Sequence, residues 1–194
     1  ADIRSIDVEV EGAAAELNMK PVTGAVLAGV MRSWSDTVNM VNAPYLAKER
    51  GLDVREVRHD REGDYHTLVR VTVTTPDGAR SAAGTLFANA APRLVDLFGI
   101  RVEAELEGEM IFIVNEDAPG FIGRIGSLMG EAGINIASAA VGYEPEDADD
   151  DGCAVMVVTT HDPVPDDVVP SPSPGPAFGC VPAFGCVPVS LMAP

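Results

Sequence analysis

The chain has 194 residues, 46% of them hydrophobic, which is enough for one medium-sized folded domain or two small ones. Thirty acidic residues against 13 basic ones give a net charge of −17, and so negative a surface repels nucleic-acid phosphates and anionic lipids. No apolar run approaches the roughly 20 residues that a membrane span needs, and no secretory leader pattern stands at the start. We therefore expect a cytoplasmic protein with neither nucleic acid nor membrane as a partner. Because Ala1 directly precedes a strand-like segment, we interpret the chain as cut from a longer protein.

The three cysteines, Cys153, Cys180 and Cys186, form neither a disulfide framework nor the spacing of a metal site. We expect free thiols in a reducing compartment and no bound metal.

The first half of the chain alternates between strand and helix signals. Residues 3–11 alternate apolar and polar side chains, as a half-buried strand does. Apolar residues at helical spacing predict helices over 23–34 and 43–50, the second ended by Gly51. Further strands are predicted over the segments 53–59, 66–75, 79–87, 93–97 and 101–106. The pattern predicts an α+β domain with a mainly antiparallel sheet over residues 1–108.

A second pattern begins at Glu109. An apolar run over 110–114 predicts a strand. Residues 117–120 then open a helix with Pro119 in its first turn, and this helix has one apolar stripe and ends at Gly133. Segments 134–142 and 153–160 are predicted to be two strands of a hairpin. The order strand–helix–strand–strand is typical of a ferredoxin-like domain, which we place at 109–169.

Two segments carry unusual composition. The loop 144–151 holds six acidic residues in eight, without the ordered ligand spacing of a calcium loop, so we expect a solvated hairpin tip. Residues 170–194 are rich in proline and repeat PAFGCV at 176–181 and 182–187. This low-complexity tail predicts no packed structure, apart from an edge strand over 187–192, and the second helix of the ferredoxin-like domain is lost.

The sequence shows no catalytic machinery. It lacks the glycine-rich fingerprint of dinucleotide binding and any evident nucleophile–base set, and its three histidines are scattered. The segment 123–126 matches the G-x-x-G of a nucleic-acid-clamping loop but lies inside an amphipathic helix, where close packing explains its glycines better. We expect no catalytic residues and no enzymatic activity from this chain alone.

One stretch suggests a small-molecule site. Asn115 and Asp117 lie where a strand ends and a helix begins, so their oxygens and the free helix N–H groups could together hold a zwitterionic amino acid, with Asn135 as a further contact. The same residues also suit a structural role, Asp117 as a helix cap and Asn135 as a turn residue.

Two sets of motifs carry a resemblance to a known family. Residues 115–120 (NEDAPG) and 133–138 (GINIAS) resemble the ACT domain, a βαββαβ module that binds amino acids. Residues 42–51 (NAPYLAKERG) and 83–87 (AGTLF) resemble the intervening, or allosteric substrate-binding, domain of long-form D-3-phosphoglycerate dehydrogenases. Together, residues 1–169 resemble the C-terminal regulatory half of that family.

The resemblance implies feedback control by L-serine, bound between two ACT domains of a homodimer or homotetramer. The effector site it implies consists of Asn115, Asp117, Gly120, Phe121 and Asn135. The catalytic domains of the parent enzyme, an NAD-dependent phosphoglycerate dehydrogenase, would be further partners, and NAD would bind there and not to this chain.

The resemblance also implies an anion site in the intervening domain of some members. Arg93 falls on one basic position of that site and Arg101 on or beside another, whereas Glu105 replaces a third. Two alternatives to a dehydrogenase fragment remain at this point: part of an enzyme similar to L-serine dehydratase, and a free-standing amino-acid-binding ACT protein.

Overall fold

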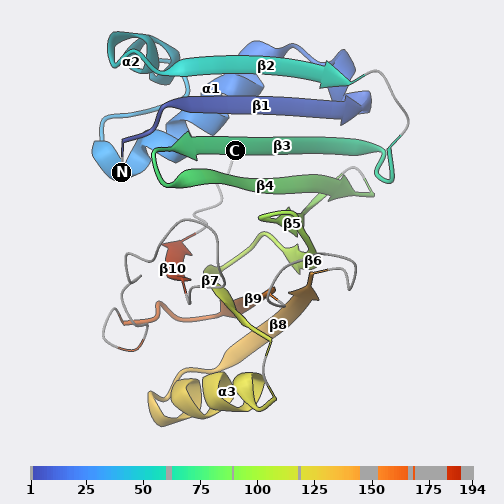
Figure 1. Ribbon diagram of the computed structural model, residues 1–194, viewed down its shortest axis with the longest axis vertical. Coiled ribbons are helices and arrows are strands. Elements are labelled where there is room, and N and C mark those ends of the chain that lie inside the picture. Colours follow the sequence, from blue (N-terminus) through green and yellow to red (C-terminus); the bar gives the residue numbers. More distant parts are fainter. Residues whose placement is uncertain are drawn as a thin grey trace. The chain divides into compact units, whose positions relative to one another are not determined.

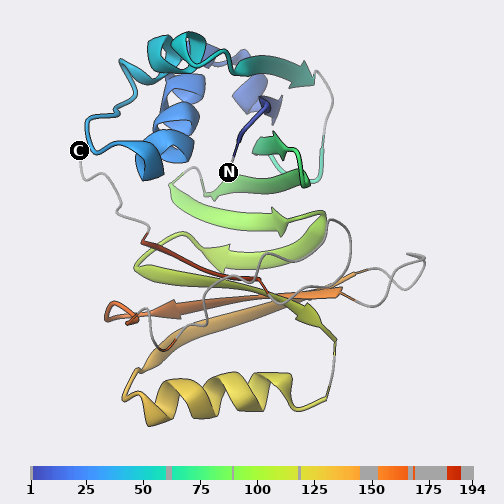
Figure 2. The same cartoon turned by 60° about the vertical axis from the view of Figure 1, so that its left-hand side comes forward.

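The computed structural model describes residues 2–59, 63–88, 90–117, 119–144, 153–165 and 168, and the backbone of 183–188. Three α-helices and ten strands lie in these residues (Figures 1 and 2), so the predicted α+β class is confirmed. The chain divides into two compact units, residues 1–90 and residues 91–194. None of the helices in the described ranges is long and apolar enough to cross a membrane.

The sheet of the first unit has the strand order β2-β1-β3-β4 (Figure 1). Strand β1 (Ser5–Gly12) pairs in parallel with β2 (Asp53–His59) and antiparallel with β3 (Thr67–Thr75), which pairs antiparallel with β4 (Gly78–Phe87). A parallel pair needs a long crossover connection. Here the connection from β1 to β2 contains the two helices of the unit.

Helices α1 (Met19–Met31) and α2 (Ala43–Glu49) build the core of the first unit with the sheet. Helix α1 begins four residues before the predicted start because the side chain of Asn18 accepts a hydrogen bond from the Lys20 N–H at 3.2 Å and caps it. Short 3₁₀ helices, Ala13–Glu16 and Arg32–Trp34, flank α1. The fully buried centre of the core consists of Ile6, Val8, Val10, Met19, Leu27, Met31, Ala43 and Ala47.

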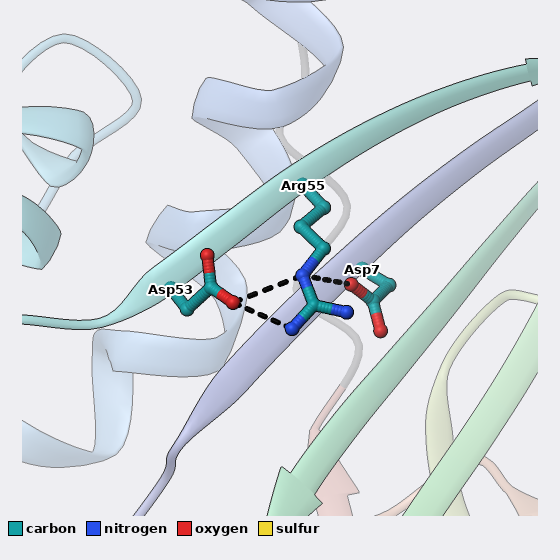
Figure 3. A network of polar contacts seen from close by, with 3 residues as sticks. All are labelled: Asp7, Asp53 and Arg55. Atoms are coloured by element: carbon teal, nitrogen blue, oxygen red, sulfur yellow. Dashed lines mark hydrogen bonds and ion pairs between the residues drawn. The ribbon is translucent and has the colours of Figure 1, made fainter.

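The other face of this sheet is polar, because the residues of β1 that alternate with its buried ones are acidic. Figure 3 shows Arg55 of β2 between two carboxylates of this face. Its Nη2 lies 2.6 Å from Asp53 Oδ2, and its Nε lies 3.7 Å from Asp7 Oδ1. The hydrogen bond that Arg55 donates to Asp53, and then the charges of Asp53 and Asp7, raise the pKa of Arg55. Because the Arg55 side chain is exposed to solvent, these ion pairs contribute little to the stability of the fold.

The second unit contains a hairpin and a separate four-stranded sheet. The hairpin consists of β5 (Ala91–Leu97) and β6 (Ile100–Glu105), as predicted. The sheet, with strand order β10-β7-β9-β8, is antiparallel throughout. Its strands are β7 (Glu109–Glu116), β8 (Ile136–Tyr143), β9 (Cys153–Thr160) and β10 (Ala183–Pro188). This order, with the first and third strands in the centre, is the one expected of a ferredoxin-like sheet.

Both faces of this sheet are covered. Helix α3 (Phe121–Glu131) covers one face of the sheet (Figure 2). Its residues Ile125 and Met129 pack there against Ile111, Ile113 and Met156. Strand β6 covers the other face, where it contacts β8 and β9. Residues 154–160 of β9 are therefore all buried. The hairpin thus packs within the second unit, although the sequence assigns it to the first domain. The domain boundary predicted at Gly108 stays a prediction.

Three expectations are corrected. The second copy of the PAFGCV repeat forms β10, which pairs with β7 over residues 183–188, so the edge strand comes earlier than predicted. The backbone of β10 pairs with the edge of β7. This pairing joins segments that are far apart in the chain, so the local composition of the tail does not predict it. Cys153 forms a disulfide instead of a free thiol; the side chains of the other two cysteines lie outside the described residues. Pro119 precedes the N-cap of α3 instead of entering its first turn.

Other expectations for the tail and the acidic loop lie largely outside the described residues. These are the loop residues 145–151 and the tail residues 170–182 and 189–194. Between Thr160 and Ala183, the residues that are described contain no helix.

Candidate functional site

A cavity of about 170 Å³ lies in the second unit, where β7 ends and α3 begins. It is lined by Asn115, Asp117, Pro119, Gly120, Phe121, Ile122, Val141, Tyr143, Ala154 and Met156. Four of the five residues predicted to bind an amino acid are among them. For scale, an apolar cavity of about 150 Å³ holds benzene, which has six non-hydrogen atoms. A small amino acid such as serine, with seven, is therefore of suitable size.

The start of α3 supplies hydrogen-bond donors to this cavity. Gly120 is the N-cap residue and has a φ of 84°, a left-handed conformation that glycine adopts without the strain of a side chain. Gly120 has no side chain that could accept a hydrogen bond from the first N–H groups of the helix. The first N–H groups of a helix lack partners within the helix and lie at the positive end of its dipole. This end of the cavity is therefore suited to a carboxylate.

The lining combines a polar rim with an apolar floor. Asn115, at the end of β7, is 5% exposed, whereas Asp117 is exposed. Val141 and Met156 come from the neighbouring strands β8 and β9 and supply the apolar part. Among the lining residues that the structure describes, the only charged side chain is the carboxylate of Asp117, so this rim favours an ammonium group.

Asn135, the fifth predicted residue, lies away from this cavity. It is exposed and directly precedes β8, whereas the cavity is at the other end of that strand, beside Tyr143. At about 3.3 Å per residue along β8, Asn135 lies roughly 20 Å from Val141 and roughly 26 Å from Tyr143, which both line the cavity. The cavity and Asn135 of one chain therefore cannot contact the same small ligand.

The apolar residues of the cavity were not predicted from the sequence. Their types are those of ordinary core positions, so the sequence gives no signal that distinguishes them: Ile122, Val141, Tyr143, Ala154 and Met156. Strand alternation could have placed Val141 and Met156 on one face, since they pair in the register of β8 and β9.

The two arginines predicted to hold an anion do not lie together. Arg93 of β5 has its Nη1 3.1 Å from Glu103 Oε1 and its Nη2 in an ion pair with Glu105 Oε1. Arg101 lies four residues from Glu105 along β6, a distance of roughly 13 Å in a strand. The guanidinium of Arg93 is thus already bound by two carboxylates.

Among the residues that the structure describes, no group of three or more histidine, cysteine, aspartate or glutamate side chains could hold a metal ion.

The fold is that of an α+β protein with a mixed sheet covered by two helices and a ferredoxin-like sheet that carries a ligand-sized cavity. The chain belongs to the family of the D-3-phosphoglycerate dehydrogenase intervening domain, whose family model matches residues 1–98.

Similarity to curated proteins extends well past residue 98. The chain is 34% identical over 166 residues to the D-3-phosphoglycerate dehydrogenase of Synechocystis, covering 84% of this chain and 29% of that protein. It is 30% identical over 168 residues to the Bacillus subtilis enzyme of the same name, covering 86% of this chain and 31% of the relative. For the Archaeoglobus fulgidus protein the identity is 33% over 162 residues, covering 83% and 30%. The chain thus spans about three-tenths of the length of these relatives, and the resemblance to this family is confirmed.

Proposed function

We propose that this chain is the regulatory part of a D-3-phosphoglycerate dehydrogenase and that its second unit is an ACT domain that binds L-serine. The observation that carries the proposal is the cavity at the start of α3, in a chain of this family. The serine carboxylate would meet the first N–H groups of α3, and the ammonium group would meet the Asp117 carboxylate. Charge-assisted hydrogen bonds of this kind are the strong ones in proteins.

The distance between Asn135 and the cavity favours a site shared by two chains. Strand β8 lies at the edge of its sheet, so a second copy could pair with it antiparallel about a two-fold axis. Such pairing brings the start of one β8 beside the end of the other. Asn135 of the partner would then lie near Tyr143 and Asp117, at the cavity. A dimer, or a tetramer made of such dimers, therefore completes the site.

Serine bound in this way would act as a feedback inhibitor of the parent enzyme. Inhibition requires that serine bind one conformational state of the enzyme more tightly than the other, typically by about 1–3 kcal/mol. The catalytic domains and NAD belong to the remainder of the parent protein. We place the parent protein in the cytoplasm.

Replacing Asn135 by alanine is expected to weaken serine binding at least tenfold, because a hydrogen bond to a charged group contributes about 1.5–3 kcal/mol. Isothermal titration of the purified dimer measures the effect. Ser127→Ala, an exposed change on α3 outside the cavity, is the matched control and should leave the affinity unaltered.

A mixed dimer tests whether the site is shared. In a dimer of one Asp117→Ala chain and one Asn135→Ala chain, a shared arrangement leaves one site with both wild-type residues. The mixed dimer should bind serine with wild-type affinity at half the wild-type stoichiometry, whereas each homodimeric variant should bind serine weakly. A mixed dimer as weak as the two homodimers would contradict the shared site, and equal affinity in all variants would contradict the serine site itself.

We also expect the isolated chain to have no NAD-dependent activity on 3-phosphoglycerate, because its sequence lacks a dinucleotide-binding fingerprint. A spectrophotometric assay of NADH formation checks this. Turnover that stays with the chain through purification would refute the assignment as a purely regulatory part.

A further inference from the structure

A second cavity in the same unit, of about 410 Å³, lies between the β5–β6 hairpin and the sheet face formed by β8 and β9. It is lined by Arg93, Glu103, Ala104, Glu105, Glu107, Ala137, Ser138, Ala139, Ala140 and Thr159. Its volume falls within the roughly 300–1,000 Å³ of small-molecule sites. None of its residues lines the cavity at the start of α3, so the two are separate.

The charge of this cavity is negative. One arginine against three glutamates gives a formal charge of 1 − 3 = −2 for its lining. Arg93 forms ion pairs with Glu103 and Glu105, which neutralise most of its positive charge. Glu107 makes no ion pair or hydrogen bond with any residue in the described part of the chain, and the side chains of Glu103 and Glu105 are 55% and 50% exposed. Carboxylate oxygens are thus available to a ligand from solvent.

Thr159 supplies an independent observation at this cavity. Its side chain lines the cavity, the residue is only 6% exposed, and its hydroxyl has no hydrogen-bond partner among the described residues. A buried polar group without a partner is costly, and in native proteins it calls for an explanation. Ser138, which pairs with Thr159 across β8 and β9, brings a second hydroxyl to the same wall.

We propose that this cavity binds a small organic amine. A primary ammonium group has three donors and no acceptor, which matches carboxylates and hydroxyl oxygens as partners. The apolar part of such a ligand would lie over the alanines of β8. An inorganic or organic anion would instead have to compete with Glu103 and Glu105 for Arg93, against the charge of Glu107.

The test uses the intact chain and 1,4-diaminobutane as the probe, at about 0.15 M salt so that attraction to the overall negative charge is screened. Isothermal titration should show saturable binding of one probe molecule per chain. Glu107→Gln is expected to weaken this binding at least tenfold, since it removes a carboxylate without releasing Arg93 from its ion pairs. Glu131→Gln, an identical charge change at the end of α3 and outside the cavity, should alter the affinity by less than twofold.

Thr159→Val gives a second variant of nearly the same shape. It should weaken the probe severalfold while thermal unfolding shows an intact fold. Non-saturable binding, or equal weakening by Glu107→Gln and Glu131→Gln, would mean attraction by net charge only and would overturn the proposal. Saturable binding of inorganic phosphate with none of the amine would overturn it in favour of an anion site.

Discussion

Replacing Ile125 by alanine is expected to lower the free energy of unfolding of the second unit by about 2–5 kcal/mol. Ile125 is 5% exposed and packs on Ile111, Ile113 and Met156, so its removal leaves a cavity between α3 and the sheet. Because α3 also begins at the proposed serine site, serine binding should weaken as the helix loosens.

Ile122→Ala makes the same chemical change one turn earlier on the same helix. Ile122 is 52% exposed, so its replacement should cost less than about 1 kcal/mol. The chain has a single tryptophan, Trp34, in the first unit, so its fluorescence does not report on α3. Urea unfolding should therefore be followed by hydrogen exchange of the α3 amides. Equal losses in the two variants would contradict the packing of α3 described above.

Replacing Gly142 by valine is expected to destabilise the second unit by about 3 kcal/mol or more, because overpacking here meets backbone atoms that cannot move aside. A Cβ at Gly142 would overlap the carbonyl oxygen of Arg101 and lie 3.0 Å from the Arg101 carbonyl carbon. The change would push β6 away from β8 and open the cavity between the β5–β6 hairpin and the sheet. Urea unfolding followed by hydrogen exchange of β8 and β9 measures the loss.

Gly130→Ala is the matched control on α3, since nothing lies within 4 Å of a Cβ at that position. Alanine has the higher helix propensity, so this variant should gain roughly 0.5–1 kcal/mol. A Gly142→Val protein as stable as wild type would contradict the close contact between β6 and β8 at Gly142.

Local sequence signals determined most of the secondary structure. Alternation and helical spacing predicted β1 to β9 and α2 and α3 to within a few residues, because these patterns depend on neighbours in the chain. The start of α1 was not predicted, because it depends on the capping side chain of Asn18 and not on the apolar spacing within the helix. Four of the five residues of the predicted amino-acid site also lie together, since they follow one another at a single strand–helix junction.

Only the tertiary structure decided which distant segments meet. It separated Asn135 from the cavity by the length of β8, and it placed Arg93 opposite Glu105 in a hairpin. It also paired β10 with β7, tied Cys153 into a disulfide and packed the β5–β6 hairpin onto β8 and β9. The physical reason is that the partner of a strand residue depends on the register of the two strands and on the path of the chain that connects them. The side chains near that residue in the sequence determine neither. The apolar floor of the cavity at the start of α3 and the buried hydroxyl of Thr159 became recognisable as parts of the proposed sites only once these pairings were known.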